Sequence, residues 1–333
     1  MKTKILQMLR QGNHYISGQE LCESLGVSRT AVWKAIKQLK EAGYEIDSVQ
    51  NRGYRLVSTP DVLSQSEIES RLNTKWMGHP VYYFNEIDST NIEAKRIAES
   101  MEGIEISGAV VVADMQTSGR GRRGRNWNSP RGSGIFFTVL LKPDITPANA
   151  PMLTLVKALA TAKGIAETTG LTPYIKWPND IVINGKKVVG ILTEMSVQVD
   201  YINYIVVGTG INVHQMEFPE EIAKTATSLD LELKQTYKDF SISRAQLLGN
   251  ILEKFEYYYE IYLETQDVST FMEEYNALLV NCNRKVRVLD PLGEFEGTAL
   301  GINSKGELLV ERKDGIVKVS SGEVSVRGIY GYI

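Results

Sequence analysis

The chain has 333 residues, enough for about two or three domains that each bury a core. Its composition, 43% apolar and 23% charged, excludes a disordered, collagen-like or coiled-coil protein. The net charge of −3 is unevenly divided: residues 1–60 hold nine Lys or Arg and five Asp or Glu, which leaves 28 basic and 35 acidic residues for 61–333. A basic head on an acidic body indicates a polyanionic partner for the head alone.

Neither a membrane segment nor a secretion signal is predicted. The best apolar run, residues 135–141, has the length of a buried strand and falls far short of the ~18 residues of a membrane span. Gln7 and Arg10 interrupt the apolar N-terminus, so no signal peptide is expected. Cys22 and Cys282 fit no metal or redox spacing. We therefore expect a cytoplasmic protein without a membrane partner, and we assign no metal-ligating residues.

The first 60 residues follow the pattern of a winged helix-turn-helix. Residues 17–25 predict a short helix, Gly26 its C-terminal turn, and Ser28 the N-cap of a second helix. Two short strands at 44–49 and 54–57 would then form the wing. Together these elements predict a DNA-binding domain over residues 1–60.

The second helix is predicted to present a basic face opposite an apolar stripe. A helical cap with a solvated basic face is the alternative interpretation. Trp33 is unusual on a DNA-reading face, where it would either contact a thymine methyl group or pack on the wing. The candidate DNA-binding residues are Ser28, Arg29, Thr30, Trp33, Lys34, Lys37, Arg52 and Arg55.

Residues 61–280 mix strand and helix patterns. Strands are predicted at 81–84, 109–113, 135–141, 174–176, 181–183, 190–195 and 204–207, and helices at 151–169 and 243–263. Several strands follow one another without a helix between them, which favours a mixed, largely antiparallel sheet over a doubly wound one. Residues 281–333 change character, and their short strand patterns separated by turns predict a small β-barrel.

A loop rich in glycine and arginine follows the strand at 109–113. Its segment 119–124, Gly-Arg-Gly-Arg-Arg-Gly, satisfies the dinucleotide fingerprint, but a turn-like stretch follows where that fold needs a helix, so this interpretation is rejected. Flexible glycines with bidentate arginines suit a loop that closes over a phosphate-bearing ligand. A nucleic-acid patch and a solvated loop remain as alternatives.

Three further motifs are candidates for a site. Asp88-Ser-Thr-Asn91 precedes a helix, where it could cap the helix, contact a ligand, or do both. Lys176-Trp-Pro-Asn-Asp180 precedes a hairpin that would bring Asp180 near Lys187, although a surface ion pair would look the same. Gly208-Thr-Gly-Ile-Asn212 ends a strand and lets the backbone approach a ligand closely.

In this order, the motifs resemble those of the bifunctional biotin–protein ligases that also act as biotin-operon repressors, and the resemblance spans the whole chain. The matching segments are 88–91, 119–124, 176–180, Lys187 ahead of Gly190, and 208–212. The resemblance implies an α+β multidomain fold. Its parts would be a winged helix-turn-helix (1–60), a mixed-sheet catalytic domain resembling class II aminoacyl-tRNA synthetases (61–280), and an SH3-like β-barrel (281–333).

The family's chemistry has two half-reactions. Biotin and MgATP give biotinyl-5′-adenylate and pyrophosphate, and a lysine of a biotin carboxyl carrier domain then takes the biotin and releases AMP. A carboxylate attacking the α-phosphorus brings two anions together, so fixed positive charge is needed. The resemblance also implies that biotinyl-5′-adenylate acts as corepressor and favours a homodimer on the operator of biotin genes.

The resemblance assigns roles to residues of this chain. Catalytic roles fall to Arg120, Arg122, Asp180 and Lys187. Biotin contacts fall to Ser89, Thr90, Asn91, Gln116, Arg120, Gly121, Arg122, Lys187 and Gly190. ATP and adenylate contacts fall to Arg120, Arg122, Trp127, Lys187 and Asn212, with Mg²⁺ accompanying ATP.

Three rival functions share parts of this pattern. A lipoate–protein ligase has the same general fold, but the winged head and the segment 176–180 weigh against it. A metabolite-sensing repressor without ligase activity would not need the full set of arginine-loop residues and Lys187. An active ligase that has lost DNA binding is the third alternative.

Overall fold

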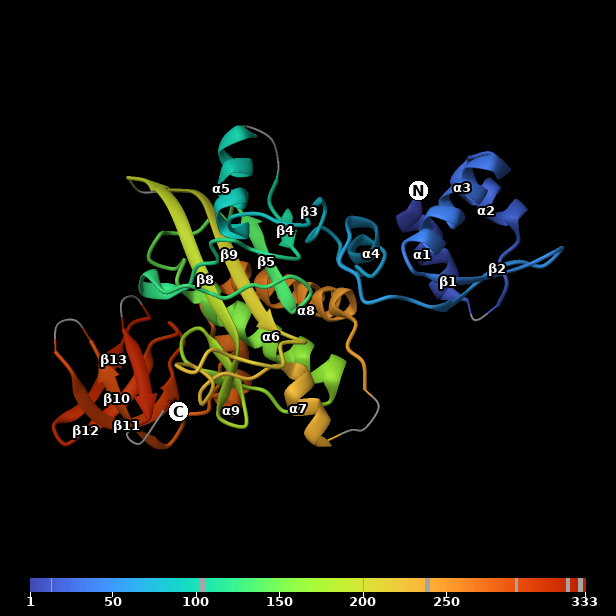
Figure 1. The fold of residues 1–333 in the computed structure, drawn as a ribbon. Coiled ribbons are helices and arrows are strands. Elements are labelled where there is room, and N and C mark those ends of the chain that lie inside the picture. Colours follow the sequence, from blue (N-terminus) through green and yellow to red (C-terminus); the bar gives the residue numbers. More distant parts are fainter. Residues whose placement is uncertain are drawn as a thin grey trace.

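The computed structural model describes residues 1–12, 14–101, 106–199, 201–236, 240–290, 293–321, 324–328 and 332–333. Figure 1 shows three parts in chain order: an N-terminal head (blue), a central body built on a sheet, and a C-terminal sheet (red). Within the described ranges, none of the helices has the length and apolar character needed to cross a membrane.

The head contains α1 (Lys2–Gln11), α2 (Gly18–Leu25), α3 (Arg29–Glu41) and the hairpin of β1 (Glu45–Val49) and β2 (Gly53–Ser58). Every predicted element of the winged helix-turn-helix is present, and α1 is an additional helix. Ser17 and Ser28 each accept a hydrogen bond from the backbone N–H three residues on, and Gly26 ends α2 in the left-handed region. Apolar residues of all three helices and β1 form the head's own core.

The body contains a seven-stranded sheet. Its spatial order is β3 (Val81–Phe84), β4 (Val110–Ala113), β5 (Gly134–Leu141), β9 (Tyr201–Asn212), β8 (Lys186–Gln198), β7 (Asp180–Ile183) and β6 (Tyr174–Lys176). All neighbouring strands are antiparallel except β3 and β4, which confirms the predicted mixed sheet. β8 and β9 extend beyond the predicted 190–195 and 204–207. Residues 196–198 and 201–203 are exposed or half-buried, and residues 208–212 are mostly buried, but their glycine, threonine and asparagine residues give no apolar run.

Helices cover both faces of this sheet (Figure 1). The two long helices α6 (Met152–Thr169) and α8 (Arg244–Thr265) confirm the predicted helical segments and share the main core with the sheet. α5 (Thr90–Ser100) packs on the other face, in a separate core with residues of β4, β5 and β9. The short helices α4 (Gln65–Glu69), α7 (Leu229–Thr236) and α9 (Met272–Leu278) were not among the predicted elements.

The C-terminal sheet is antiparallel throughout. Its spatial order is β13 (Gly315–Val319), β12 (Leu308–Arg312), β11 (Phe295–Ile302), β10 (Arg284–Leu289) and β14 (Ser325–Gly328). These five strands match the strand patterns expected after residue 281. Val286, Val310 and Val326 belong to the same hydrophobic core as the body, so the C-terminal sheet is packed against the body.

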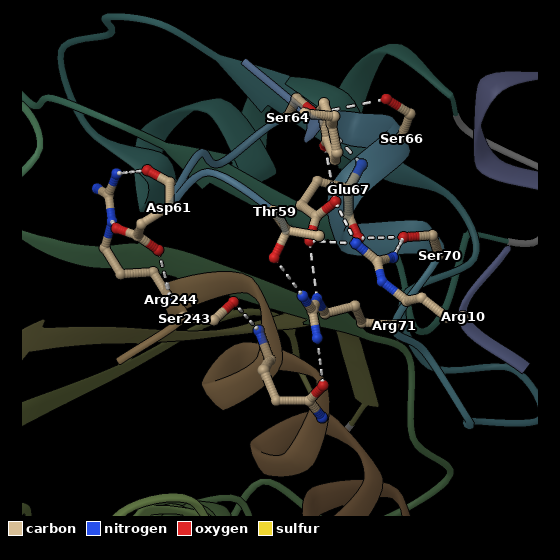
Figure 2. Close-up of polar contacts among 12 residues, drawn as sticks. Arg10, Thr59, Asp61, Ser64, Ser66, Glu67, Ser70, Arg71, Ser243 and Arg244 are labelled. Atoms are coloured by element: carbon tan, nitrogen blue, oxygen red, sulfur yellow. Dashed lines mark hydrogen bonds and ion pairs between the residues drawn. The ribbon is translucent and has the colours of Figure 1, made fainter. Parts of the chain in front are cut away.

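A buried carboxylate on α4 joins the head to the body (Figure 2). Glu67 is 0% exposed; it accepts hydrogen bonds from Arg10 at 2.6 and 2.7 Å and from Tyr44 at 2.7 Å, both from the head. Arg71 donates to Glu67 at 2.7 Å and to Gln246 of α8 at 2.6 Å. Burial would raise the pKa of Glu67, but the hydrogen bonds from Arg10, Tyr44 and Arg71 hold it below its usual value. The head is therefore attached through a carboxylate that stays ionised.

The main core contains a buried lysine. Lys157 of α6 is 0% exposed, and its Nζ lies 4.3 Å from the ring centroid of Phe137 and 4.2 Å from that of Phe255. Among the described residues Nζ has no hydrogen-bond partner. Burial holds the pKa of Lys157 well below its usual value.

We expect Lys157→Met to raise the free energy of unfolding by about 1–4 kcal/mol, because it replaces an amine whose burial disfavours its charged form with an apolar side chain. In the native state the pKa is lowered, whereas in the unfolded state lysine holds its proton up to about pH 10.4. The stability of the wild type therefore rises with pH between the lowered native-state pKa of Lys157 and its unfolded-state pKa. Over the same pH range, the stability gained by Lys157→Met becomes smaller. Urea unfolding at about pH 6 and about pH 9 measures both effects. Exposed Lys285→Met is the control, and an equal gain at both pH values would contradict the assignment.

Candidate active site and DNA-binding face

A polar pocket lies beside the start of α5, on the face of β8 and β9. Its lining includes all nine residues expected to contact biotin: Ser89, Thr90, Asn91, Gln116, Arg120, Gly121, Arg122, Lys187 and Gly190. The rest of its lining consists of Trp127, Asn179, Ile191, Leu192, Gly208, Thr209 and Gly210. Segments far apart in the sequence thus converge on one pocket.

The first wall of this pocket is held by a glutamine. Gln116 Oε1 accepts from Thr90 N at 2.9 Å and lies 3.2 Å from Thr90 Oγ1, and its Nε2 donates to Ser129 Oγ at 2.9 Å. Ser89 occupies the N-cap position of α5, but its side chain makes no capping bond. Asp88 Oδ1 accepts from the Ser89 N–H instead, at 2.7 Å. Ser89 is therefore the N-cap of α5 by position only. Its hydroxyl does not cap the helix and is available to contact a ligand.

The second wall is organised by Asn91. Its Oδ1 lies 2.6 Å from Thr138 Oγ1, and its Nδ2 donates to Glu194 Oε2 at 2.7 Å. Burial would raise the pKa of Glu194, but the hydrogen bonds from Lys95 and Asn91 outweigh it and keep the carboxylate ionised. A Cβ at position 208 would lie 2.1 Å from Asn91 Oδ1, so Gly208 is required for this close approach. The result is a buried set of oriented amide and hydroxyl groups.

Trp127 lies across two paired strands. Gly190 of β8 is directly opposite Gly210 of β9, and a Cβ on either would come within 2.7 or 2.5 Å of the Trp127 ring. Lys187 Nζ lies 5.3 Å from the ring centroid. Trp127 Nε1 is buried and has no hydrogen-bond partner among the described residues. The two glycines thus form a flat shelf that lets the indole lie on the sheet.

Asp180 and Lys187 meet across the hairpin of β7 and β8, as expected. Lys187 Nζ lies 2.6 Å from Asp180 Oδ1, and Tyr332 OH donates to Asp180 Oδ2 at 2.6 Å. Burial would raise the pKa of Asp180, but Lys187 and Lys176 outweigh it and hold it below its usual value. Burial, with Lys187, Arg327 and Arg125 nearby, lowers the pKa of Lys176 to about 8. Asp180 is a buried anion that holds cations around it.

A second pocket continues from the first, and Gly121, Arg122, Trp127, Asn179 and Lys187 line both. Four of the five residues expected to contact ATP line this second pocket: Arg122, Trp127, Lys187 and Asn212. Arg120 lines only the first. The lining also includes Arg125, Lys176 and Arg327 at one end, and Phe218, Ile222 and Ala226. The pocket thus combines cations with an apolar wall, which suits a phosphate-bearing ligand that has an aromatic part.

Contacts of Arg122 hold the arginine loop (segment 119–124) in place. Arg122 donates to Asn179 Oδ1 at 2.9 Å, and to the carbonyls of Ser321 and Val324 at 3.0 and 3.2 Å. These bonds join the loop to the segment 176–180 and to the C-terminal sheet. Arg122 is therefore engaged in the fold, which argues against a freely solvated loop at this residue.

Several residues around the pockets were missed by the sequence analysis. Ser129, Thr138 and Glu194 lie outside the recognised motifs. Thr138 and Glu194 are placed by the pairing of β5 with β9 and of β9 with β8, and Ser129 by an isolated bridge to Gln116. Tyr332 lies near the C-terminus, and its ring is 4.1 Å from Lys176 Nζ. No local pattern signals it, because its contacts come from strands about 150 residues earlier in the chain.

Most of the candidate DNA-binding residues of the head are exposed. Trp33 is 55% exposed and has Lys37 Nζ 5.6 Å from its ring centroid, so it is not packed against the wing. Arg29, Thr30, Lys34, Lys37 and Arg52 are exposed as well. Several of the candidates also have partners inside the head. Ser28 Oγ caps α3, and Arg29 donates to Gln19 Oε1 at 3.0 Å. Arg52 and Arg55 both lie over the Tyr15 ring, and Arg55 is 3.7 Å from Asp47.

Three family models match the chain. An HTH domain matches residues 2–55, the biotin/lipoate A/B protein ligase family matches residues 86–212, and the biotin protein ligase C-terminal domain matches residues 282–327. These three matches follow the head, the body and the C-terminal sheet.

Similar proteins of known name cover the same parts. The bifunctional ligase/repressor BirA of Bacillus subtilis is 41% identical over 98% of both chains, and that of Escherichia coli is 30% identical over 97% of this chain and 96% of its own. A solved structure of the biotin protein ligase from Aquifex aeolicus, in complex with biotin and ATP, has a TM-score of 0.64 and 33% identity. It covers 74% of this chain and 98% of that one. The chain therefore belongs to the family of bifunctional ligase/repressors, in which a biotin–protein ligase carries an N-terminal helix-turn-helix domain.

Proposed function

We propose that this chain activates biotin with ATP to biotinyl-5′-adenylate, transfers biotin to a lysine of a biotin carboxyl carrier domain, and represses biotin genes with the adenylate as corepressor. The observation that carries the ligase function is the junction of the two pockets at Lys187, Arg122 and Trp127. A carboxylate in the first pocket and an α-phosphate in the second would meet at that junction.

In this proposal the first pocket binds the ureido ring of biotin. A ureido group has two N–H donors and one carbonyl acceptor, and it carries no charge. Ser89, Thr90 and Asn91 are buried and Gln116 is half-buried, and together they offer hydrogen-bond donors and acceptors from hydroxyl and amide groups. The Asn91 amide is held by Thr138 and Glu194, so its orientation is fixed before biotin arrives.

Adenylation follows at the junction. The biotin carboxylate oxygen attacks the α-phosphorus of ATP, a new C–O–P linkage forms, and the bond to the pyrophosphate oxygen breaks. We propose that Lys187, Arg120 and Arg122 neutralise the approaching anions, with Asp180 holding Lys187 in place. Mg²⁺ would accompany ATP and share the charge of the leaving pyrophosphate. Trp127 and Asn212 would contact the adenylate.

Transfer to the carrier completes the reaction. The neutral amine of the acceptor lysine attacks the acyl carbon of the mixed anhydride, AMP leaves, and the amine gives up a proton. Asp180 is the carboxylate in the second pocket, and we propose that it orients the incoming lysine. The Arg122 bonds to the C-terminal sheet would keep water away from the reactive adenylate until then.

The repressor function is assigned to the head, where α3 would lie in the major groove and the wing would follow the DNA backbone. We propose that biotinyl-5′-adenylate favours a homodimer whose two heads bind the two halves of an operator in the cytoplasm. Arg29, Thr30, Trp33, Lys34, Lys37 and Arg52 are proposed to contact DNA directly. Ser28 would act by capping α3, and Arg55 by holding the wing on Tyr15.

A carrier domain incubated with this protein, biotin and MgATP should gain the mass of one biotin on one lysine, and lipoate should give no gain. Mass spectrometry measures both. Lys187→Ala should lose at least about a hundredfold in biotin-dependent pyrophosphate release, the typical cost of removing one group that stabilises transition-state charge. A gain with lipoate alone would assign the chain to the lipoate branch, and no gain with either would contradict the ligase function.

Arg122→Gly should release biotinyl-5′-adenylate into solution. It removes three hydrogen bonds of a charged group that fasten the loop, and each contributes about 1.5–3 kcal/mol. The loss of even one of these bonds should raise the population of the open loop about tenfold or more. A biotin blot of bystander proteins mixed with the variant should show new labelled bands. Lys285→Ala, at an exposed residue of the C-terminal sheet, is the control, and unlabelled bystanders with Arg122→Gly would contradict the sealing role.

Lys34→Ala should weaken DNA binding without regard to sequence, because an exposed lysine on α3 contacts phosphate. The slope of log affinity against log salt should fall by about 1 for this one lysine. Fluorescence anisotropy with a random-sequence duplex over a salt series measures the slope. Lys285→Ala, exposed on the C-terminal sheet, is the control. An unchanged slope for Lys34→Ala would remove α3 from the proposed DNA-binding face.

A further inference from the structure

His214 connects the end of β9 to the linker between β2 and α4, residues 59–64. Its Nδ1 lies 2.9 Å from Asp230 Oδ2, and its Nε2 lies 2.9 Å from Asp61 Oδ2. Asp61 directly follows residue 60, where the predicted head ends, and Asp230 lies in α7. A protonated imidazole donates from both ring nitrogens, so it satisfies both carboxylates at once.

The charges of this group favour that state. Burial would lower the pKa of His214, but the hydrogen bonds to Asp61 and Asp230 outweigh it and raise the pKa above the usual value. Burial would raise the pKa of Asp61, but the hydrogen bond from His214 and the charge of Arg244 outweigh it and lower that pKa. His214 is thus a cation held between two anions.

Asp61 is anchored to the sheet on its other side (Figure 2). Arg244 donates to Asp61 from its backbone N and from Nε, both at 2.7 Å. Arg244 Nη1 also donates to Asp114 Oδ1 at 2.8 Å and to the Gly134 carbonyl at 3.1 Å, next to β4 and at the start of β5. Asp61 is therefore a fixed point, and His214 is held against it.

The segment around His214 forms a wall of the second pocket. Asn212 and Gln215, on either side of His214, both line that pocket. Asn212 Nδ2 donates to the Thr227 carbonyl at 3.0 Å, and Asp230 N donates to the Val213 carbonyl at 2.9 Å. The contacts of His214 with Asp230 and Asp61 thus hold the segments 212–215 and 227–230 together.

We propose that Asp61, from the linker of the DNA-binding head, is a positioning residue for the nucleotide end of the ligase site and acts through His214. This inference rests on the proposed function, because it assigns the pocket wall at Asn212 to ATP. Asp61 itself lines neither pocket and touches no substrate. Its effect should therefore fall on ATP binding and should spare biotin.

Asp61→Asn tests this in the full-length protein, with pyrophosphate release and carrier-domain biotinylation followed at varied ATP and at varied biotin. The KM for ATP should rise roughly tenfold, the effect of one charge-assisted hydrogen bond. The KM for biotin and the kcat should stay within about twofold. A role limited to holding the fold would instead lower the active fraction and leave both KM values unchanged.

Two further variants separate positioning from folding. His214→Gln leaves the bonds between Asp61 and Arg244 in place and should raise the KM for ATP to a similar extent. The double variant should be no worse than either single variant, because both remove the same interaction. Glu69→Gln is the matched control: Glu69 is another carboxylate at the head–body junction, bonded to Thr3 and Gln65, and its loss should leave the KM for ATP unchanged.

The dependence of the KM for ATP on pH is a further test. It should not change if Asp61 and His214 only hold the fold together. His214 faces Asp61 and Asp230, and Asp61 faces Arg244, so deprotonation of His214 weakens the wall. The KM for ATP of the wild type should rise as pH increases through the raised pKa of His214. His214→Gln should lack this transition but keep any transition that belongs to Lys176, whose pKa is about 8.

Each result decides the inference. A selective, non-additive rise in the KM for ATP supports it. A KM for ATP that is unchanged in both Asp61→Asn and His214→Gln, or a loss of kcat alone, overturns it while the ligase function stands. A wild type without biotin-dependent pyrophosphate release would overturn the proposed function, and the inference with it.

Discussion

Asp180 is the residue on which the charges of the active site depend. It is buried at the start of β7, and it binds Lys187 through one oxygen and Tyr332 through the other. Without it, Lys176 and Lys187 would repel each other in a site that also contains Arg125 and Arg327. A site built to bring two anions together must hold cations close to one another when it is empty, and a single buried carboxylate makes this possible.

The shape of the site depends on glycines as much as on charge. Gly190 and Gly210 pair across β8 and β9, and the absence of side chains there lets Trp127 lie on the sheet. Gly208, on the same strand, leaves room for Asn91. Residues 208–210 of β9 thus contact both Asn91, in the polar wall of the first pocket, and the ring of Trp127, which lines both pockets. A flat backbone surface of this kind keeps the two pockets within reach of a single reaction.

The fold was largely predictable from the sequence where local patterns are strong. Local sequence signals predict these elements directly. They are the caps at Ser17 and Ser28, the turn at Gly26, and the apolar runs of β4, β5 and α6. The short helices α4, α7 and α9 were missed because five to eight residues give too little periodicity. The motifs also contain most of the residues that line the first pocket, but not the apolar wall of the second. Thr138, Glu194 and Tyr332 escaped because their positions follow from strand pairing and from contacts between distant segments, which no local pattern encodes.

Two carboxylates six residues apart, Asp61 and Glu67, lie where the head meets the body. Each is fixed by an arginine of the body, Arg244 or Arg71. Each also binds a further partner: Glu67 binds Arg10 of the head, and Asp61 binds His214 next to the nucleotide pocket. Buried charges tolerate little displacement, because a partner that moves away leaves an unpaired ion. A shift of the linker would therefore disturb the pocket wall, and a shift of the wall would disturb the linker, since coupling between two sites is reciprocal. If Asp61 positions the pocket wall as proposed, the short segment between these two carboxylates would link the wall of the second pocket to the head.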